Sequence, residues 1–266
     1  MLSKEKLKQI MKLKTKKGRK QRGMFLIEGL KLCEEAVGSG WWMETVLFTS
    51  SFEEKPTGKR LLRRLRGLGA DLIQARTQDL AKLSETVTAQ GIICVGRIKD
   101  LGLKELWRKK PKVILGLDHV GDPGNVGTLI RTADAFGVDA VILSENSAES
   151  LNPKVVRSTM GSIFHLEIVD DVDLEKAVID MKRRRFRIIG TNAKEGKTPD
   201  ELKPWDKICL LVGSEPEGLS KNLLKLSDEI VRVPACGKAE SLNVAVAGGI
   251  LLYEVTRKRM RTRLPR

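Results

Sequence analysis

Residues Val113–Ser144 read VILGLDHVGDPGNVGTLIRTADAFGVDAVILS and carry the strongest signal for the fold class. The apolar run Val113–Leu117 predicts a buried strand, and Ala140–Leu143 predicts a second one. Between them lie a turn rich in glycine and proline and a helical pattern over Asn125–Phe136. A strand, a helix and another buried strand in this order are typical of a parallel sheet covered by helices.

The same alternation continues to the C-terminal end of the chain. Helices are expected at Pro153–Met160, Leu174–Arg184, Leu219–Leu226 and from Leu242 to about Lys258. Strands are expected at Phe164–Val169, Arg187–Ile189, Ile208–Val212 and Ile230–Val233. The pattern predicts a parallel sheet with helices on both faces.

The first part of the chain predicts a smaller α/β layer. Strands and helices alternate from Phe25–Ile27 to Ile92–Val95, after a basic helical arm at residues 1–22. The segment Asp100–Lys112 is polar and basic, and Pro111 prevents a helix from running into the next strand. We therefore expect one domain at residues 1–98, a linker at 99–111 and a second domain at 112–266.

The charge of the chain points to a polyanionic partner. Its 266 residues include 49 Lys and Arg against 34 Asp and Glu, for a net charge of +15. The basic residues gather in four clusters: Lys12–Arg22, Lys59–Arg66, Lys182–Arg187 and Arg257–Arg266. Clustering favours a nucleic acid as partner over a generally basic, solvated surface.

The cysteines give no sign of a metal site. Cys33, Cys94, Cys209 and Cys236 form no CxxC pair, and the chain has only two histidines. We expect no zinc and interpret the cysteines as small buried side chains in a reducing compartment. No apolar run is long enough to span a bilayer. The basic N-terminus lacks the apolar stretch of a secretory signal, and its richness in lysine makes a mitochondrial transit peptide a weaker possibility. We expect a cytoplasmic protein.

Ligands of open parallel sheets bind beyond the carboxyl ends of the strands, so the loops there are the places to search for chemistry. In the first such loop, Asn125 can cap a helix whose free N–H groups favour an anion, and Arg131 can reach a phosphate held near the helix start. The alternative is a capped helix with a solvated arginine.

Two further loops carry polar residues. ICLLVGSEPEGLS, residues 208–220, places Glu215 just past a buried strand, and the absence of GxGxxG argues against a dinucleotide oxidoreductase. VRVPACGKAESLNVAVAGGILLYE, residues 231–254, opens a helix near Ser241, which can act as an N-cap. Gly248 and Gly249 each cost about 1 kcal/mol in a helix, which indicates close packing against a backbone or a ligand.

Together, DPGNVGTLIRTADAFG, LLVGSEPEGLS and VPACGKAESLNVAVAGGILLYE resemble the three signature motifs of the SpoU/TrmH family of SPOUT RNA 2′-O-ribose methyltransferases. The segment MFLIEGLKLCEEAV is similar to the ribosomal-protein-like substrate-binding domain of many members. The resemblance implies a trefoil-knotted α/β domain that binds S-adenosylmethionine, works as a homodimer and methylates a ribose 2′-hydroxyl of RNA. Large-subunit (23S) ribosomal RNA is favoured over transfer RNA as the substrate, by analogy with two-domain members.

The resemblance also implies the site. The implied catalytic residues are Asn125, Arg131, Glu215, Ser241 and Asn243. The implied cofactor-binding residues are Thr191, Asn192, Gly213, Val233 and Leu242. A guanidinium rarely gives up its proton, so Arg131 is expected to clamp a phosphate rather than to act as a base. The second motif departs from the family at Ser214 and Pro216, where asparagine and glycine are common.

Two other functions are compatible with parts of the sequence. A non-catalytic RNA-binding or ribosome-assembly protein would explain the charge, but it would not require the five implied catalytic residues together. A base-modifying enzyme of the same superfamily is a closer rival, against which the ESLN segment at residues 240–243 argues.

Overall fold

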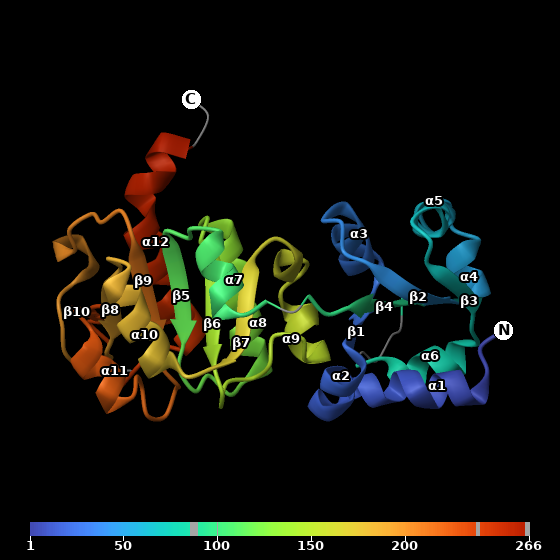
Figure 1. The fold of residues 1–266 in the computed structure, drawn as a ribbon, viewed down its shortest axis with the longest axis horizontal. Helices are drawn as coiled ribbons and strands as arrows, with labels where there is room; N and C mark the ends of the chain where they lie inside the picture. Colours follow the sequence, from blue (N-terminus) through green and yellow to red (C-terminus); the bar gives the residue numbers. More distant parts are fainter. Residues whose placement is uncertain (86–89, 100, 238–239, 264–266) are drawn as a thin grey trace. The chain divides into compact units, whose positions relative to one another are not determined.

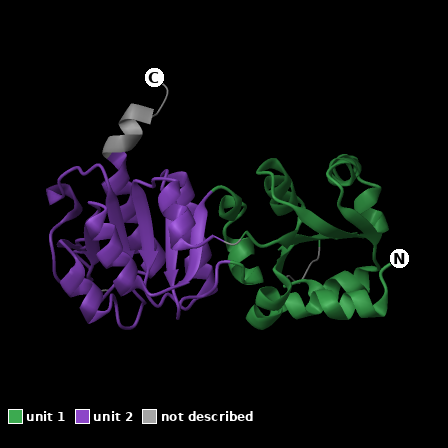
Figure 2. Cartoon of the chain, in the orientation of Figure 1, with its two compact units in different colours: residues 1–100, 151–165 green, residues 101–150, 166–266 purple. Residues whose placement is uncertain are grey.

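The computed structural model describes residues 1–85, 90–99, 101–237 and 240–263, with the backbone alone from residue 258. The chain divides into two compact units (Figure 2), here called the N-terminal unit, residues 1–100 and 151–165, and the C-terminal unit, residues 101–150 and 166–266. Both contain a sheet flanked by helices, which confirms the α/β class. Among the described residues, no helix is long and apolar enough to cross a membrane.

The N-terminal unit is built on a four-stranded mixed sheet in the order β1-β4-β2-β3. Its strands are β1 (Met24–Glu28), β2 (Met43–Phe48), β3 (Asp71–Gln74) and β4 (Ile92–Arg97). Strand β4 is antiparallel to β1 and β2, whereas β2 and β3 are parallel. The parallel pair is joined by a helical crossover, as parallel neighbours require.

Helices cover both faces of this sheet (Figure 1). One face carries α1 (Lys4–Met11), η1 (Lys12–Lys14), α2 (Lys16–Arg22) and α6 (Thr77–Leu83). The other carries α3 (Leu30–Gly38), α4 (Ser50–Glu53) and α5 (Pro56–Gly67). Residues 4–22 are helical as expected but do not form a free arm, because Leu7, Ile10 and Leu13 are buried in the core of this unit. Their helical spacing gives the segment an apolar face that the sheet covers.

A segment from the second half of the sequence completes the N-terminal unit. It contains α9 (Pro153–Ser158) and the short helix η2 (Ser162–Phe164). The ring of Phe164 lies 5.3 Å from that of Trp41, which in turn lies 5.5 Å from Phe25 of β1. The core of the unit therefore depends on residues that are distant in sequence.

The C-terminal unit has a six-stranded sheet in the order β10-β8-β9-β5-β6-β7. Every pair of neighbours is parallel, as the sequence predicted. The strands are β5 (Val113–Leu117), β6 (Ala140–Ser144), β7 (Glu167–Val172), β8 (Arg187–Thr191), β9 (Ile208–Val212) and β10 (Glu229–Val231). Strands β5, β6 and β9 are entirely buried, which is why they read as unbroken apolar runs.

Helices pack on both faces of the parallel sheet. One core cluster joins α7 (Leu103–Arg108), α10 (Leu174–Arg183) and α11 (Lys221–Leu226). Helices α8 (Pro123–Ala135) and α12 (Val244–Arg263) pack against each other. A Cβ on Gly248 of α12 would lie 2.5 Å from Leu129 Cδ2 of α8, so close helix packing explains this glycine.

Some element boundaries differ from those that the sequence predicted. The expected linker contains α7, whose Leu106 is fully buried, because Leu103, Leu106 and Trp107 have helical spacing among the lysines. Strand β7 begins three residues later than predicted, since η2 occupies Ser162–Phe164. The trefoil knot depends on the path of residues 232–243, of which 238 and 239 lie outside the described residues, and it stays a prediction.

Candidate active site

The loops that follow β5 and β9 are held together at the carboxyl edge of the sheet. These strands are neighbours, and the amide of Asp118 donates to the carbonyl of Val212 over 2.8 Å. The buried carboxylate of Asp118 accepts a hydrogen bond from the backbone of Ser220 at 2.9 Å. Asp118 was not among the site residues predicted from the sequence, although an acidic residue directly after a buried strand is a signal for such a role.

Three polar side chains from three distant parts of the chain meet at this edge. Oε1 of Glu215 accepts a hydrogen bond from Nδ2 of Asn125 at 2.9 Å and another from Nδ2 of Asn243 at 2.7 Å. Nδ2 of Asn243 also lies 3.1 Å from Oδ1 of Asn125. We call Asn125, Glu215 and Asn243 the amide–carboxylate cluster. It joins one residue from each of the three motifs.

Two helix starts position the asparagines. Asn125 lies in the first turn of α8, and its amide donates to Oδ1 of Asp122 at 2.9 Å. Oδ1 of Asn243 accepts from the amides of Ala245 and Val246 at the start of α12. The predicted caps are therefore wrong: Asp122 rather than Asn125 caps α8, and Asn243 rather than Ser241 caps α12. The side chain of Asn125 is thereby free to reach Glu215.

The loop that carries Glu215 turns back on itself just past β9. The amide of Ser214 donates to the carbonyl of Gly218, and the amide of Gly218 donates to the carbonyl of Ser214. A Cβ on Gly213 would lie 2.1 Å from the backbone of Gly218 and Leu219, so only glycine fits there. Pro216 lies inside the turn, where its missing N–H leaves these hydrogen bonds intact.

Arg131 and Ser241 remain apart from the amide–carboxylate cluster. Both side chains are exposed, and neither makes a hydrogen bond or an ion pair with any residue that the structure describes. Arg131 lies six residues beyond Asn125 on α8, about 120° around the helix. A hydrogen-bonded frame is thus preassembled, and the exposed guanidinium of Arg131 lies on a different side of α8.

The implied cofactor residues follow neighbouring strands. Thr191 ends β8, Gly213 follows β9, and Val233 lies two residues past β10. The amide of Asn192 donates to the carbonyl of Val231, and its side chain accepts from the amides of Lys194 and Glu195. These residues therefore lie along one edge of the sheet. Leu242 is 39 % exposed and precedes Asn243 of the amide–carboxylate cluster.

An open groove of about 550 Å³ begins at Asn125 and Asn243 and runs between α8 and α12. Its apolar lining includes Val246, Ile250 and Tyr253, which are 52, 39 and 46 % exposed. The Tyr253 ring lies 5.7 Å from that of Phe136. We call this surface the α8–α12 face.

The cysteines and the groups that could bind a metal ion can also be compared with the prediction. Cys33, Cys94 and Cys209 are buried as expected, and burial raises the pKa of the Cys209 thiol. Cys236 is exposed, contrary to the prediction, because it lies in the loop after β10. Within the described parts of the chain, no group of three or more His, Cys, Asp or Glu side chains could hold a metal ion.

The fold and the site have clear relatives. Residues 112–253 match the family model described as SpoU rRNA Methylase family, and residues 4–94 match the MRM3-like substrate binding domain. The structure is similar to the SpoU methyltransferase AviRb from Streptomyces viridochromogenes in complex with AdoMet, with a TM-score of 0.88, 28% identity and coverage of 97% of this chain and 99% of that chain. It is similar also to an AdoMet-bound rRNA methyltransferase from Sinorhizobium meliloti, with a TM-score of 0.85, 27% identity and coverage of 97% and 96%. The class is thus that of the two-domain SpoU methyltransferases.

A relative in sequence agrees with this class. The 23S rRNA (guanosine(2553)-2'-O)-methyltransferase RlmP from Bacillus subtilis (strain 168) is 37% identical over 254 residues, which cover 94% of this chain and 96% of that protein. The chain belongs to the SpoU rRNA methylase family.

Proposed function

We propose that this protein transfers a methyl group from S-adenosylmethionine to a ribose 2′-hydroxyl of 23S ribosomal RNA. The observation that carries the proposal is the amide–carboxylate cluster at the carboxyl edge of the parallel sheet, where one residue from each motif meets. Membership of the family and the similarity to AdoMet-bound methyltransferases support the reaction class. The 23S rRNA methyltransferase RlmP supports the substrate, which would place the activity in the cytoplasm.

The edge formed by Thr191, Asn192, Gly213, Val233 and Leu242 fits the cofactor. In the described part of the chain, the amides of Val233 and Leu242 make no backbone hydrogen bond, so they remain available to a ligand. Gly213 has no side chain, so none covers the backbone at this point of the edge. These residues would hold S-adenosylmethionine mainly through backbone groups. Bound there, the cofactor supplies an electrophilic methyl group on a sulfonium.

The side chains around the edge orient the RNA. A ribose hydroxyl is a poor nucleophile, so it must be aligned with the methyl group and lose its proton as it attacks. Arg131, exposed and unpaired among the described residues, clamps a phosphate next to the target ribose. The guanidinium keeps its proton, so a flanking phosphate or a water molecule accepts the proton of the hydroxyl. Asn125 and Asn243 position the nucleotide, Glu215 holds both amides, and Ser241 binds the ribose or a phosphate.

The α8–α12 face is the surface through which we propose that two copies pair. Val246, Ile250 and Tyr253 form an apolar stripe that continues directly from Asn125 and Asn243 of the cluster. Exposed apolar patches of this kind mark protein interfaces. A second copy seated there would place its own residues next to the cluster. The α12 substitution Ile250→Glu should therefore produce monomers in sedimentation analysis and lower methyl transfer, whereas Lys221→Glu on α11 should do neither.

The reaction is tested with purified protein, radiolabelled S-adenosylmethionine and unmodified RNA transcripts. Methylation of a 2′-oxygen blocks alkaline strand cleavage at that ribose, so label in alkali-resistant dinucleotides of 23S RNA is the expected result. Label confined to transfer RNA would keep the chemistry and overturn the substrate, and label in alkali-sensitive nucleotides would indicate base methylation. Absence of label in every RNA would overturn the proposed activity. The Arg131→Ala variant should lose most turnover, and full turnover would remove the proposed clamp.

A further inference from the structure

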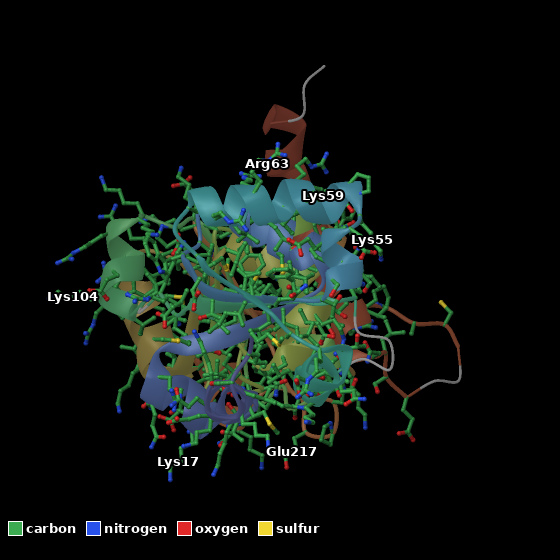
Figure 3. The ribbon with its side chains drawn as sticks, turned by 90° about the vertical axis from the view of Figure 1, so that its right-hand side faces the viewer. Lys17, Lys55, Lys59, Arg63, Lys104 and Glu217 are labelled. Atoms are coloured by element: carbon green, nitrogen blue, oxygen red, sulfur yellow. The ribbon has the colours of Figure 1, made fainter. Side chains whose placement is uncertain are left out.

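Helix α5 of the N-terminal unit has one apolar face and one strongly basic face. Leu61, Leu62 and Leu65 are buried, which fixes the orientation of the helix on the sheet. The exposed residues of the opposite face are Lys59, Arg60, Arg63, Arg64 and Arg66, with Lys55 at the N-cap. Figure 3 shows Lys55, Lys59 and Arg63 along the outer side of this helix. We call these six residues the α5 basic face.

The charges of this face are almost entirely uncompensated. Helix α5 contains no acidic residue. Among the described residues, its one ion pair joins Arg60 to Glu34 at 3.5 Å. Six cations that repel one another on a surface helix are destabilising unless a partner neutralises them.

The basic cluster of residues 182–187 differs in this respect. Lys182 is paired with Asp228 at 2.9 Å, and Arg184 is paired with Asp180 at 3.1 Å. Arg187 is paired with Glu229 at 3.0 Å. These pairs neutralise three of the five cations of that cluster within the fold. By contrast, five of the six cations of the α5 basic face form no ion pair with any residue that the structure describes.

The spacing of the α5 basic face suits a chain of phosphates. Lys55, Lys59 and Arg63 follow one another at intervals of four residues, which places them in one row. From Lys55 to Arg66 the helix rises about 16 Å. Phosphates along one strand of B-form DNA succeed one another at about 3.4 Å of helix axis, and with an RNA spacing of the same order the row can meet several phosphates. No aromatic residue lies on α5, so contacts to stacked bases are not expected from this surface.

From these observations we propose that the α5 basic face binds the sugar–phosphate backbone of the RNA substrate, at nucleotides other than the one that is methylated. The inference rests on the proposed function and adds the surface that holds the RNA. The contact is electrostatic and independent of base sequence, and it anchors the RNA while the C-terminal unit selects the ribose.

The test reverses three charges of the face in the full-length protein. The variant Lys59→Glu/Arg63→Glu/Arg66→Glu is compared with Lys4→Glu/Lys8→Glu/Lys12→Glu, which makes the same change in net charge. The control residues are also exposed and lie on α1 and η1, on the other face of the same sheet (Figure 1). Circular dichroism and thermal unfolding establish that both variants fold.

Filter binding and methyl transfer on a 23S transcript give the readouts. We expect the α5 variant to raise Kd and KM roughly tenfold or more, with kcat unchanged, and to reduce the slope of log K against log salt by about 2 to 3. The control should stay within about twofold of the wild type at the same salt. Equal losses in both variants would reveal a general effect of net charge and overturn the proposal, as would an unchanged salt slope. If the wild type binds RNA but methylates none, the proposed function fails. The difference in RNA binding between the α5 variant and the control still tests whether the α5 basic face binds RNA.

Discussion

Glu215 holds two amides with one carboxylate oxygen. Oε1 accepts from Nδ2 of Asn125 at 2.9 Å and from Nδ2 of Asn243 at 2.7 Å. Hydrogen bonds to a charged acceptor are stronger than neutral ones, so this single atom fixes two side chains that start different helices. The carboxylate is exposed, which limits its contribution to stability and leaves positioning as its main effect.

The substitution Glu215→Gln tests that positioning effect. Glutamine is neutral, so its amide oxygen accepts the two hydrogen bonds more weakly than the carboxylate does, and both asparagine side chains are held less firmly in position. We expect kcat for methyl transfer to fall about 10- to 100-fold, because small misplacements cost that much, while the thermal midpoint changes little. Glu217→Gln, an exposed change in the same loop, is the matched control and should leave kcat unaltered. A kcat equal to that of the wild type in Glu215→Gln would refute the role.

Glu229 gives a prediction for pH. Its hydrogen bond from Lys197 at 2.8 Å and the nearby Arg187 hold the pKa of this carboxyl below its usual range. Because the pKa of Glu229 is lower in the folded state, its ionised carboxylate stabilises the fold at any pH above its pKa in the unfolded chain, about 4.3. This stabilisation is lost as the pH falls through the pKa of the folded state. Urea unfolding should thus show Glu229→Gln to be less stable than the wild type at pH 7, with a difference that shrinks below about pH 4. A difference that stays constant over this range would exclude the electrostatic cause.

At the scale of single residues, the sequence predicted the side chains of the amide–carboxylate cluster better than the helix caps and the buried carboxylate that hold the surrounding loops. Asn125, Glu215 and Asn243 were among the implied residues, and the structure brings these three together. The helix caps were misassigned because Asp and Asn side chains are all good N-caps, and the choice depends on backbone angles that composition does not encode. Asp118 was overlooked, since its partner lies 102 residues away.

Among the elements, the turn after β9 is the most constrained. A Cβ on Gly213 would lie 2.1 Å from backbone atoms of Gly218 and Leu219, which cannot move aside as a side chain can. Gly213→Ala should therefore lower the free energy of unfolding by about 3 kcal/mol or more, measured by urea denaturation. Gly121→Ala, where a Cβ meets no atom within 4 Å, should change it by less than about 0.5 kcal/mol. Similar stabilities for both variants would show that the turn relaxes.

The elements themselves were largely predictable, and the exceptions have physical causes. Strands β5, β6 and β9 are buried on both sides, so their apolar runs were unambiguous. Helix α7 was taken for a linker, because its lysines and Pro111 hid the spacing of Leu103, Leu106 and Trp107. The basic N-terminal segment, residues 1–22, was predicted as a helical arm, and its apolar stripe is buried in the core of the N-terminal unit. Short amphipathic helices with many charges are thus the elements that composition conceals.

At the scale of the whole molecule, sequence order and structural units do not coincide. Residues 151–165 lie between β6 and β7 in the chain but belong to the N-terminal unit. Val155 and Val156 of α9 are buried there, and Phe164 stacks edge-on against Trp41. Local patterns predicted the helix but could not assign it to a unit, because the unit is defined by contacts between distant segments. The chain therefore passes between the units three times.

This crossing predicts where a core mutation will act. Phe164 is 6 % exposed and packs on Trp41, so Phe164→Ala should cost about 3 to 5 kcal/mol in the N-terminal unit. Hydrogen exchange should then accelerate in β1 and β2, although both precede residue 164 by more than 100 positions. The amides of β5 and β9 should keep their protection.

Phe186→Ala is the matched control in the C-terminal unit. Phe186 is 5 % exposed and belongs to the core cluster of α7, α10 and α11. Its removal should accelerate exchange in β8 and β9 and leave β1 and β2 protected. If both variants accelerated exchange everywhere to the same extent, the two units would unfold as one, and the assignment of residues 151–165 would have no thermodynamic meaning. Opposite exchange patterns would show that a segment encoded within the methylase half stabilises the N-terminal unit.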